Sequence, residues 1–257
     1  SNHAGQYTED MEFHGSGISK LSYPFKIIYS KEAKRKMRIV MEDFKPDVVH
    51  LNNINFQLTP SVIDAVREYD AKYHVHTRLI ATAHDMQWVC PDHLMLTADR
   101  NGRYHTCFEC RGGHYGNCIK NRCIHGSRLQ SVLGAYEALF YAKRGTYRKI
   151  DRIISPSGFL KKQLETNPQL SGRIEVMHNF IPPVAEEYGG DADEPELPDR
   201  YVLYFGRFSE EKGIGTLLKV CRELPDIQFV FAGNGPMQGE VEKLKNVINV
   251  GFLKGKT

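Results

Sequence analysis

The chain has 257 residues, of which 41% are hydrophobic and 25% are charged, and its formal net charge is +3. This balance is typical of a globular protein with one large domain or two small ones, and so weak a net charge does not by itself indicate a nucleic-acid partner. No apolar run is long enough to cross a bilayer, and the first residues lack the pattern of a signal peptide.

Helical patterns alternate with short apolar runs along most of the chain, after a polar first stretch of about thirty residues that predicts a loop. Such runs are typical of buried parallel strands. Predicted helices occupy residues 31–44, 60–69, 129–140, 157–165, 213–223 and 237–245, and predicted strands occupy residues 47–51, 78–83, 151–155, 173–179, 201–205, 227–233 and 247–253. One apolar stripe of the helix at 129–140 consists of Leu129, Val132, Leu133, Tyr136, Leu139 and Phe140.

An acidic stretch rich in proline and glycine, residues 182–199, interrupts this alternation, and we place a linker at 186–199. The alternation on both sides predicts an α/β fold of two domains with parallel sheets. These are residues 1–185, with a cysteine-rich insertion at about 90–126, and residues 200–257. Because ligands of such sheets bind beyond the carboxyl ends of the strands, the loops that matter are HLNN, AHD, SPS, HNF, FGRFSEEKG, AGNGP and VGF.

The loop FGRFSEEKG is a candidate anion site. Arg207 offers a planar fork for phosphate oxygens, Lys212 adds a mobile positive charge, and a helix that begins near Gly213 directs free N–H groups towards the loop. The alternative is a surface loop in which Glu210 and Glu211 neutralise the two cations.

Three successive segments, FGRFSEEKGIGTLLKV, FVFAGNGP and VINVGFLKG, resemble in order and spacing the donor-binding half of group 1 retaining glycosyltransferases. PDVVHLNN, IATAHDMQWVCP, IISPSGFLKKQL and VMHNFIPP are similar to successive strand ends of the acceptor domain of that family. The resemblance implies a GT-B architecture, in which two Rossmann-like domains face a cleft. It also implies transfer of a sugar from a nucleotide-diphosphate donor to an acceptor, with retention of configuration.

The resemblance further implies roles for particular residues. Arg207 and Lys212 would hold the donor diphosphate and stabilise the charge of the leaving group, and His84 would reach towards the transferred sugar. For His84 the alternative is a structural histidine at the end of a strand. The positions implied to bind the donor are Gly206, Gly235, Gly251, Phe252 and Leu253. The family needs no catalytic metal, and its acceptors include glycans, lipid-linked molecules and small molecules.

Two features of the family are not found in the sequence. One is a first strand with a glycine-rich loop, and the other is a pair of glutamates two helical turns apart, one of which normally binds the donor ribose. We therefore expect the chain to be a fragment with weak donor affinity even with Arg207 and Lys212 in place. A transferase-like protein without activity is an alternative.

Five of the six cysteines lie in one short region. An odd number of cysteines in one region, without a secretory signal, argues against a disulfide scaffold. We therefore expect a cytosolic protein, with the inner face of the membrane as a permitted location. Their spacing allows four thiolates to close a tetrahedron around a structural Zn²⁺. The candidate ligands are Cys107, Cys110, Cys118 and Cys123, with Cys90, His105 or His114 as substitutes. An iron–sulfur cluster, reduced thiols or disulfides are the alternatives.

Residues 143–152, KRGTYRKIDR, carry five basic residues and one acidic residue. Together with a zinc-stabilised insertion, they suggest a nucleic-acid-binding or partner-binding module as the rival class of function. A solvated helix face explains the same residues, so we expect no nucleic-acid partner. Contact with an anionic membrane surface is permitted by the sequence.

Overall fold

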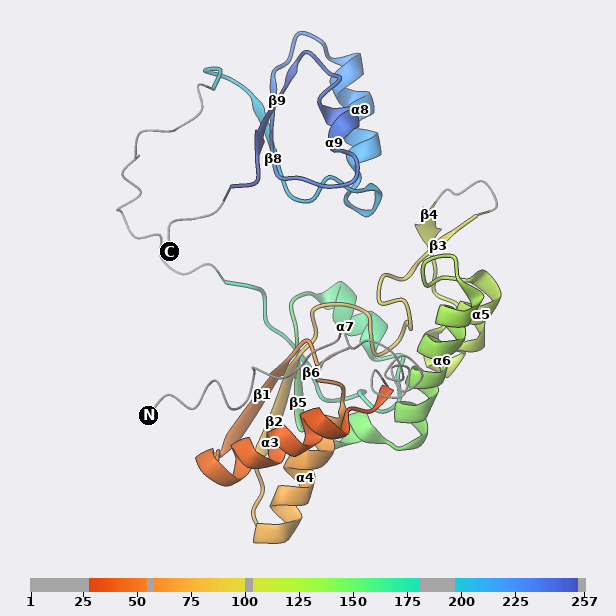
Figure 1. Ribbon diagram of the computed structural model, residues 1–257, viewed down its shortest axis with the longest axis vertical. Coiled ribbons are helices and arrows are strands. Elements are labelled where there is room, and N and C mark those ends of the chain that lie inside the picture. Colours follow the sequence, from red (N-terminus) through yellow and green to blue (C-terminus); the bar gives the residue numbers. More distant parts are fainter. Residues whose placement is uncertain (1–27, 55–57, 100–103, 181–196, 254–257) are drawn as a thin grey trace, which may run out of the picture. The chain divides into compact units, whose positions relative to one another are not determined.

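The computed structural model describes residues 28–54, 58–99, 104–180 and 197–253. The chain divides into two compact units, Ser1–Ile181 and Pro182–Thr257, whose helices and strands are labelled in Figure 1. Most of the predicted first loop and most of the predicted linker at 186–199 lie outside the described residues.

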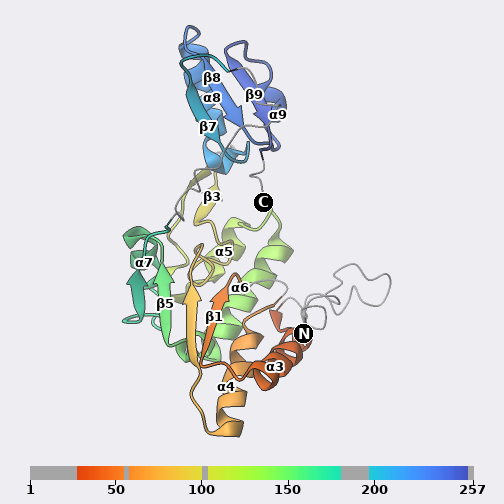
Figure 2. The same ribbon diagram turned by 90° about the vertical axis from the view of Figure 1, so that its left-hand side faces the viewer.

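The first unit is built on a parallel sheet with the strand order β1, β2, β5, β6. These strands are β1 (Val48–Asn52), β2 (Arg78–Thr82), β5 (Arg152–Ser155) and β6 (Ile174–Val176). Helix α4 (Ser61–Tyr73) connects β1 to β2, and α7 (Gly158–Leu164) connects β5 to β6. Because the strands run in one direction, their carboxyl ends meet at one edge of the sheet (Figure 2). The predicted α/β class with parallel sheets is confirmed.

Helix α3 (Lys31–Phe44) packs against α4, and local caps decide where these helices begin and end. The hydroxyl of Ser30 accepts a hydrogen bond from the N–H of Ala33 at 3.0 Å, which begins α3. Lys45 and His74 adopt the left-handed conformation, with φ of 45° and 54°, and end α3 and α4.

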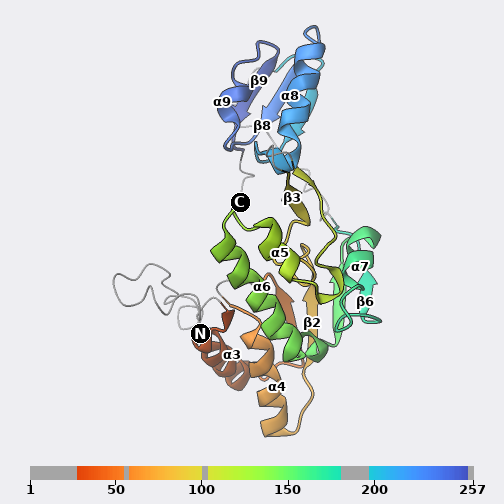
Figure 3. The same ribbon diagram turned by 90° about the vertical axis from the view of Figure 1, so that its right-hand side faces the viewer.

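The cysteine-rich insertion contains more regular structure than its sequence predicts. It consists of the antiparallel pair β3 (Leu96–Ala98) and β4 (Tyr104–Thr106), the 3-10 turn η1 (Arg111–Gly113) and helix α5 (Gly116–Asn121). The long helix α6 (Arg128–Lys143) runs alongside α5 (Figure 3), and the 3-10 turn η2 (Thr146–Lys149) leads from it towards β5. These short elements show no apolar period because they bury few side chains.

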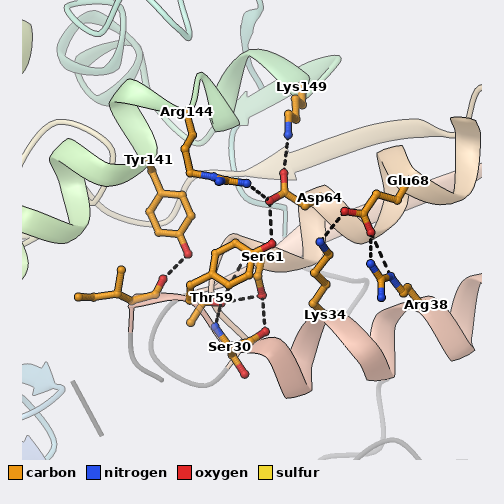
Figure 4. A network of polar contacts seen from close by, with 12 residues as sticks. Ser30, Lys34, Arg38, Thr59, Ser61, Asp64, Glu68, Tyr141, Arg144 and Lys149 are labelled. Carbon is orange, nitrogen blue, oxygen red and sulfur yellow. Dashed lines mark hydrogen bonds and ion pairs between the residues drawn. The ribbon is translucent and has the colours of Figure 1, made fainter. Parts of the chain in front are cut away.

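A polar network joins α3, α4 and the chain that follows α6 (Figure 4). Asp64 of α4 is 3% exposed, and it accepts hydrogen bonds from the guanidinium of Arg144 at 2.9 Å and from the ammonium of Lys149. The hydroxyl of Tyr29 donates a third bond to it at 3.0 Å. A buried carboxylate tolerates loss of water only when such partners surround it, so the network holds α4 against the segment that enters β5.

The second unit has a parallel sheet with the order β7 (Val202–Phe205), β8 (Phe229–Ala232) and β9 (Val247–Gly251). The 3-10 turn η3 (Glu210–Lys212) and helix α8 (Ile214–Glu223) connect β7 to β8, and α9 (Gln238–Val241) lies between β8 and β9. Its core is formed by Phe208, Ile214, Leu218, Cys221, Phe229, Phe231 and Val241. No helix within the described part of the chain combines the length and apolarity needed to cross a membrane.

Candidate functional site

The turns that follow the three strands of the second unit are tied to one another by backbone hydrogen bonds. The N–H of Gly206 donates to the carbonyl of Ala232 at 2.9 Å, and the N–H of Gly233 donates to the carbonyl of Gly251 at 2.7 Å. These bonds bring the carboxyl ends of β7, β8 and β9 into one platform, where a ligand of a parallel α/β sheet is expected.

Two glycines make this close crossing of loops feasible. A Cβ atom on Gly233, whose φ is 147°, would lie 2.0 Å from the carbonyl oxygen of Gly206. A Cβ atom on Gly235, whose φ is 158°, would lie 2.5 Å from the carbonyl oxygen of Phe208. Only glycine fits these positions, since both the space and the backbone conformation exclude a side chain.

A pocket with a volume of about 480 Å³ opens on this platform, and all three strand ends contribute to it. Its lining residues are Phe205, Gly206, Arg207, Ala232, Gly233, Asn234, Phe252 and Leu253. Such a volume is typical of sites for small molecules. Apolar and aromatic side chains form most of the walls, while Arg207 supplies a positive charge and Asn234 an amide. The combination suits a ligand with a flat apolar part and an anionic part.

The structure separates the predicted donor-side residues into two groups. Gly206, Arg207, Phe252 and Leu253 line the pocket, whereas Gly235, Gly251 and Lys212 do not. Gly251 ends β9, and Lys212 is exposed at the end of η3. Sequence reasoning missed the lining residues Phe205 and Ala232, although both lie at the carboxyl end of a predicted strand. Gly233 and Asn234 belong to AGNGP, one of the strand-end loops that the sequence indicated.

Arg207 and Lys212 form no ion pair within 4.0 Å of a carboxylate of the described residues. Glu211 instead accepts a hydrogen bond from the hydroxyl of Ser209 at 2.7 Å. That hydrogen bond lowers the pKa of Glu211, and the positive charges of Arg207 and Lys212 lower it further. The two cations therefore lower the pKa of Glu211 without forming an ion pair with it. The guanidinium of Arg207 is thus available to a ligand.

The predicted anion site at the start of α8 already has a carboxylate beside it. Gly213 precedes the helix with φ of 76° and no side-chain cap. An oxygen of Glu210 lies 3.1 Å from the point where a Cβ atom of Gly215 would be, in the first turn of α8. A carboxylate is favoured near the positive end of a helix, so an anionic ligand that used this end would compete with Glu210.

In the first unit, His84 lies just beyond the carboxyl end of β2. Its Nε2 atom is 3.0 Å from Oδ1 of Asn52, the last residue of the neighbouring β1, and His84 itself is exposed. The Nε2 atom of His50 is similarly 2.8 Å from the hydroxyl of Thr82. An exposed imidazole held by an amide can hydrogen-bond a hydroxyl-rich ligand. Sequence reasoning did not identify Asn52, whose place in HLNN is the available signal.

Three cysteines of the insertion, Cys110, Cys118 and Cys123, belong to a small cluster packed against α6, whereas Cys90 lies in the main core of the first unit. Cys110 and Cys118 are buried with Tyr115 and Ala135, and Cys123 packs against them. All six cysteines are free thiols.

Contacts between these thiols shift their pKa values. Burial, together with the charges of Cys90, Cys123 and Cys107, raises the pKa of Cys110 to about 12. A hydrogen bond from Cys118 lowers the pKa of Cys123 to about 7. Within the described residues, no group of three or more His, Cys, Asp or Glu side chains is placed to hold a metal ion. The four-thiolate zinc site therefore stays a prediction.

The basic segment 143–152 is largely engaged in structural contacts. Arg144 and Lys149 pair with Asp64, and Arg152 lies 3.3 Å from Glu175. Three of the five cations of this segment therefore have a carboxylate partner within the protein, and a nucleic acid is not needed to explain them.

Known proteins similar to the chain are glycosyltransferases. An alpha-D-kanosaminyltransferase of Streptomyces kanamyceticus is 30% identical over 116 residues, which cover 40% of this chain and 30% of that protein. The uncharacterized glycosyltransferase YqgM of Bacillus subtilis (strain 168) is 30% identical over 108 residues, 39% of this chain and 28% of that protein. The match thus spans less than a third of either relative.

No family model matches the chain. Among solved structures, the apo form of the lipopolysaccharide outer core galactosyltransferase WaaB has a TM-score of 0.41 and 14% sequence identity, over 92% of this chain and 50% of that one.

Proposed function

We propose that the chain is part of a retaining glycosyltransferase of GT-B architecture, and that the pocket at the carboxyl ends of β7, β8 and β9 binds its nucleotide-diphosphate sugar donor. The pocket itself carries this proposal, because one guanidinium stands among aromatic walls and glycine backbone at the sheet edge where α/β folds bind ligands. The two glycosyltransferase relatives support the class of reaction.

In this proposal each part of the donor meets a matching surface. The base lies on the apolar side chains of Phe252 and Leu253, where a flat ring gains contact area. The diphosphate lies against Arg207 and within reach of Lys212, which stabilise the charge that develops on the leaving nucleotide. For His84 we propose contact with a sugar hydroxyl, a role that rests on the family resemblance of the segment IATAHD. The proposal assigns charge stabilisation to these side chains and needs no catalytic metal.

On the family resemblance we propose a glycan, a lipid-linked molecule or a small molecule as the acceptor, with strand-end loops of the first unit, such as the one that carries His84, as its contacts. The thiol cluster of the insertion takes no part in the reaction. We propose that it holds a structural zinc ion, which would give a segment with few buried apolar side chains a centre to fold around.

Isothermal titration of the 257-residue chain with UDP, GDP and ADP tests the pocket. We expect at least one of these nucleotides to bind and the variant Arg207→Ala to weaken that binding about tenfold, since a charge-assisted hydrogen bond is lost. Lys219→Ala, a change to an exposed cation on α8, is the matched control and should bind like the unchanged chain.

Tight, salt-dependent binding of RNA or DNA without nucleotide binding would instead favour the rival binding module. The stereochemistry is tested on the complete gene product. An inverted anomeric configuration of the product, read from its NMR spectrum, would refute a retaining mechanism.

A further inference from the structure

The segment that follows β2, residues 84–93, folds back on itself, and we call it the histidine loop because His84 begins it. The N–H of Met86 donates to the carbonyl of His93 at 3.1 Å, and the N–H of His93 donates to the carbonyl of Cys90 at 2.9 Å. His93 adopts the left-handed conformation, with φ of 65°, which is uncommon for a residue other than glycine. The two ends of the loop are therefore in direct contact.

The side chain of Asp85 also joins the two ends of the histidine loop. Its Oδ1 atom accepts a hydrogen bond from the N–H of Gln87 at 2.8 Å, which closes a tight turn directly after His84. Its Oδ2 atom lies 3.6 Å from Nδ1 of His93, within reach of an ion pair with the protonated imidazole. The side chains of Asp85 and His93 are 34% and 23% exposed, so water screens their interaction only in part.

Asp85 is the carboxylate best suited to hold His93 at neutral pH. Burial alone would raise the pKa of Asp85, but His93 and the N–H of Gln87 outweigh it and hold that pKa below its ordinary value. The charge of His93 also reaches Asp92 and Glu137, but burial raises the pKa of these carboxyls to about 6 and about 7. An ionised carboxylate makes the stronger bond to an imidazole, so Asp85 is the partner that closes the loop.

The middle of the histidine loop is anchored in the core of the first unit. Trp88 is 2% exposed, the centroid of its ring lies 5.7 Å from that of Tyr147, and its carbonyl accepts a bond from the amide of Asn167 at 2.8 Å. His84 is instead exposed at the start of the loop. Because the centre of the loop is fixed, the position of His84 depends on the turn that Asp85 closes.

We propose that Asp85 and His93 are positioning residues, which keep the histidine loop closed and so hold the imidazole of His84 where it would contact a sugar hydroxyl. The role of His84 rests on the proposed function, whereas the closure of the loop rests on the contacts of Asp85 and His93. Without this pair, the turn after His84 opens while Trp88 stays in the core. Misplacement of about 1 Å near the reacting atoms can slow a reaction roughly 10²-fold, so even a small opening should affect turnover.

Hydrogen exchange of the 257-residue chain tests whether the pair closes the loop. The amide of Met86 reports on closure, because it donates to the carbonyl of His93. Asp85→Asn keeps an oxygen for the N–H of Gln87 but removes the charge that holds His93. His93→Gly removes the imidazole, while glycine readily adopts the left-handed backbone. Each variant should speed exchange at Met86 roughly fivefold, since one charge-assisted contact is lost.

A double variant distinguishes a pair from two unrelated contacts. If Asp85 and His93 act on each other, Asp85→Asn with His93→Gly should exchange no faster than His93→Gly alone. The matched controls are Leu94→Gly, which adds the same backbone freedom beside His93, and Asp92→Asn, which removes a neighbouring carboxyl. Both controls should stay within about twofold of the unchanged chain. Additive losses in the double variant would overturn the pair, as would unchanged exchange in Asp85→Asn.

Steady-state kinetics of the complete gene product with a nucleotide-sugar donor test the positioning of His84. His93→Gly should lower kcat roughly tenfold with little change in the KM for the donor, because residues of the second unit line the donor pocket. His93→Asn should restore most of the loss, since its amide nitrogen can take the place of Nδ1. A normal kcat in His93→Gly, beside a slowed Arg207→Ala, would overturn the positioning role. Normal turnover of Arg207→Ala would instead contradict the proposed function, and hydrogen exchange would still decide whether the pair closes the loop.

Discussion

The carbonyl oxygen of Gly206 occupies the space that a side chain on Gly233 would need, because a Cβ atom there would lie 2.0 Å away. The two glycines directly follow β7 and β8, and both line the pocket, so their contact holds the loops after these strands together at the pocket. The pocket therefore depends on a backbone approach that no larger residue tolerates.

Gly233→Ala is expected to destabilise the second unit by about 3 kcal/mol or more, because the methyl group meets backbone and the φ of 147° is strained for alanine. Hydrogen–deuterium exchange of the peptides that contain β7 and β8 measures the effect. Gly239→Ala is the control, since a Cβ atom there has no neighbour within 4 Å, and it should be neutral or slightly stabilising. Unchanged protection in Gly233→Ala would show that the loops do not cross as described.

Arg207 and Lys212 are expected to contribute unequally to turnover, since Arg207 lines the pocket and Lys212 does not. In the complete gene product, Arg207→Ala should lower kcat/KM on the order of 10²-fold, and Lys212→Ala should lower it less. Steady-state kinetics with a nucleotide-sugar donor measure both variants. Near-normal turnover of Arg207→Ala would remove the guanidinium from the proposed mechanism.

Asp64 is expected to give the first unit a stability that depends on pH. Burial alone would raise the pKa of Asp64, but the hydrogen bonds from Lys149, Tyr29 and Arg144 outweigh it and hold the pKa below its ordinary value. A carboxyl whose pKa is lowered by folding stabilises the fold above its unfolded pKa of about 3.9, and this stabilisation is lost as the pH falls through the folded pKa.

Asp64→Asn should therefore cost about 3 kcal/mol at neutral pH and flatten the loss of stability in acid, as measured by urea unfolding. Glu68→Gln is the matched control. The Glu68 side chain is 45% exposed, and it pairs with Lys34 and Arg38 on the surface, so its loss should cost less than about 1 kcal/mol. Equal costs for the two variants would contradict the role given to the buried network.

The thiol cluster is expected to bind zinc through Cys107, Cys110, Cys118 and Cys123, after a rotation of side chains that brings the sulfur atoms around one point. Elemental analysis of protein purified without added metal should find about one equivalent. Cys118→Ser should lower that content, whereas Cys221→Ser, in the core of the second unit, should leave it unchanged. A metal content below about a tenth of an equivalent, with the thiols of the insertion titratable, would refute the prediction.

The sequence by itself determined most of the secondary structure, because helices and strands follow from the pattern of neighbouring residues. The apolar runs and helical periods predicted each strand of the two parallel sheets, because strands of parallel sheets are rich in consecutive apolar residues. Of these strands β8 is buried along its whole length, whereas β7 is largely exposed among the described residues. The place of Arg207 directly after a strand indicated an anion ligand, since parallel strands bring their following loops to one edge. Gly206, Phe252 and Leu253 were implied by the resemblance to group 1 retaining glycosyltransferases, and all four residues line the pocket.

Only the tertiary structure decided which side chains meet a ligand and which meet the protein. Periodicity identified the apolar stripe of α6, but whether that stripe is buried depends on what packs against the helix. The thiol cluster packs against another face of α6, and much of the stripe is exposed. The cations Arg144 and Lys149 became structural because α4 carries Asp64 to them across the fold. The bond between His84 and Asn52 likewise needs two strands that are neighbours in the sheet and distant in the chain. Such pairings depend on distances in space, which the order of residues along the chain does not contain.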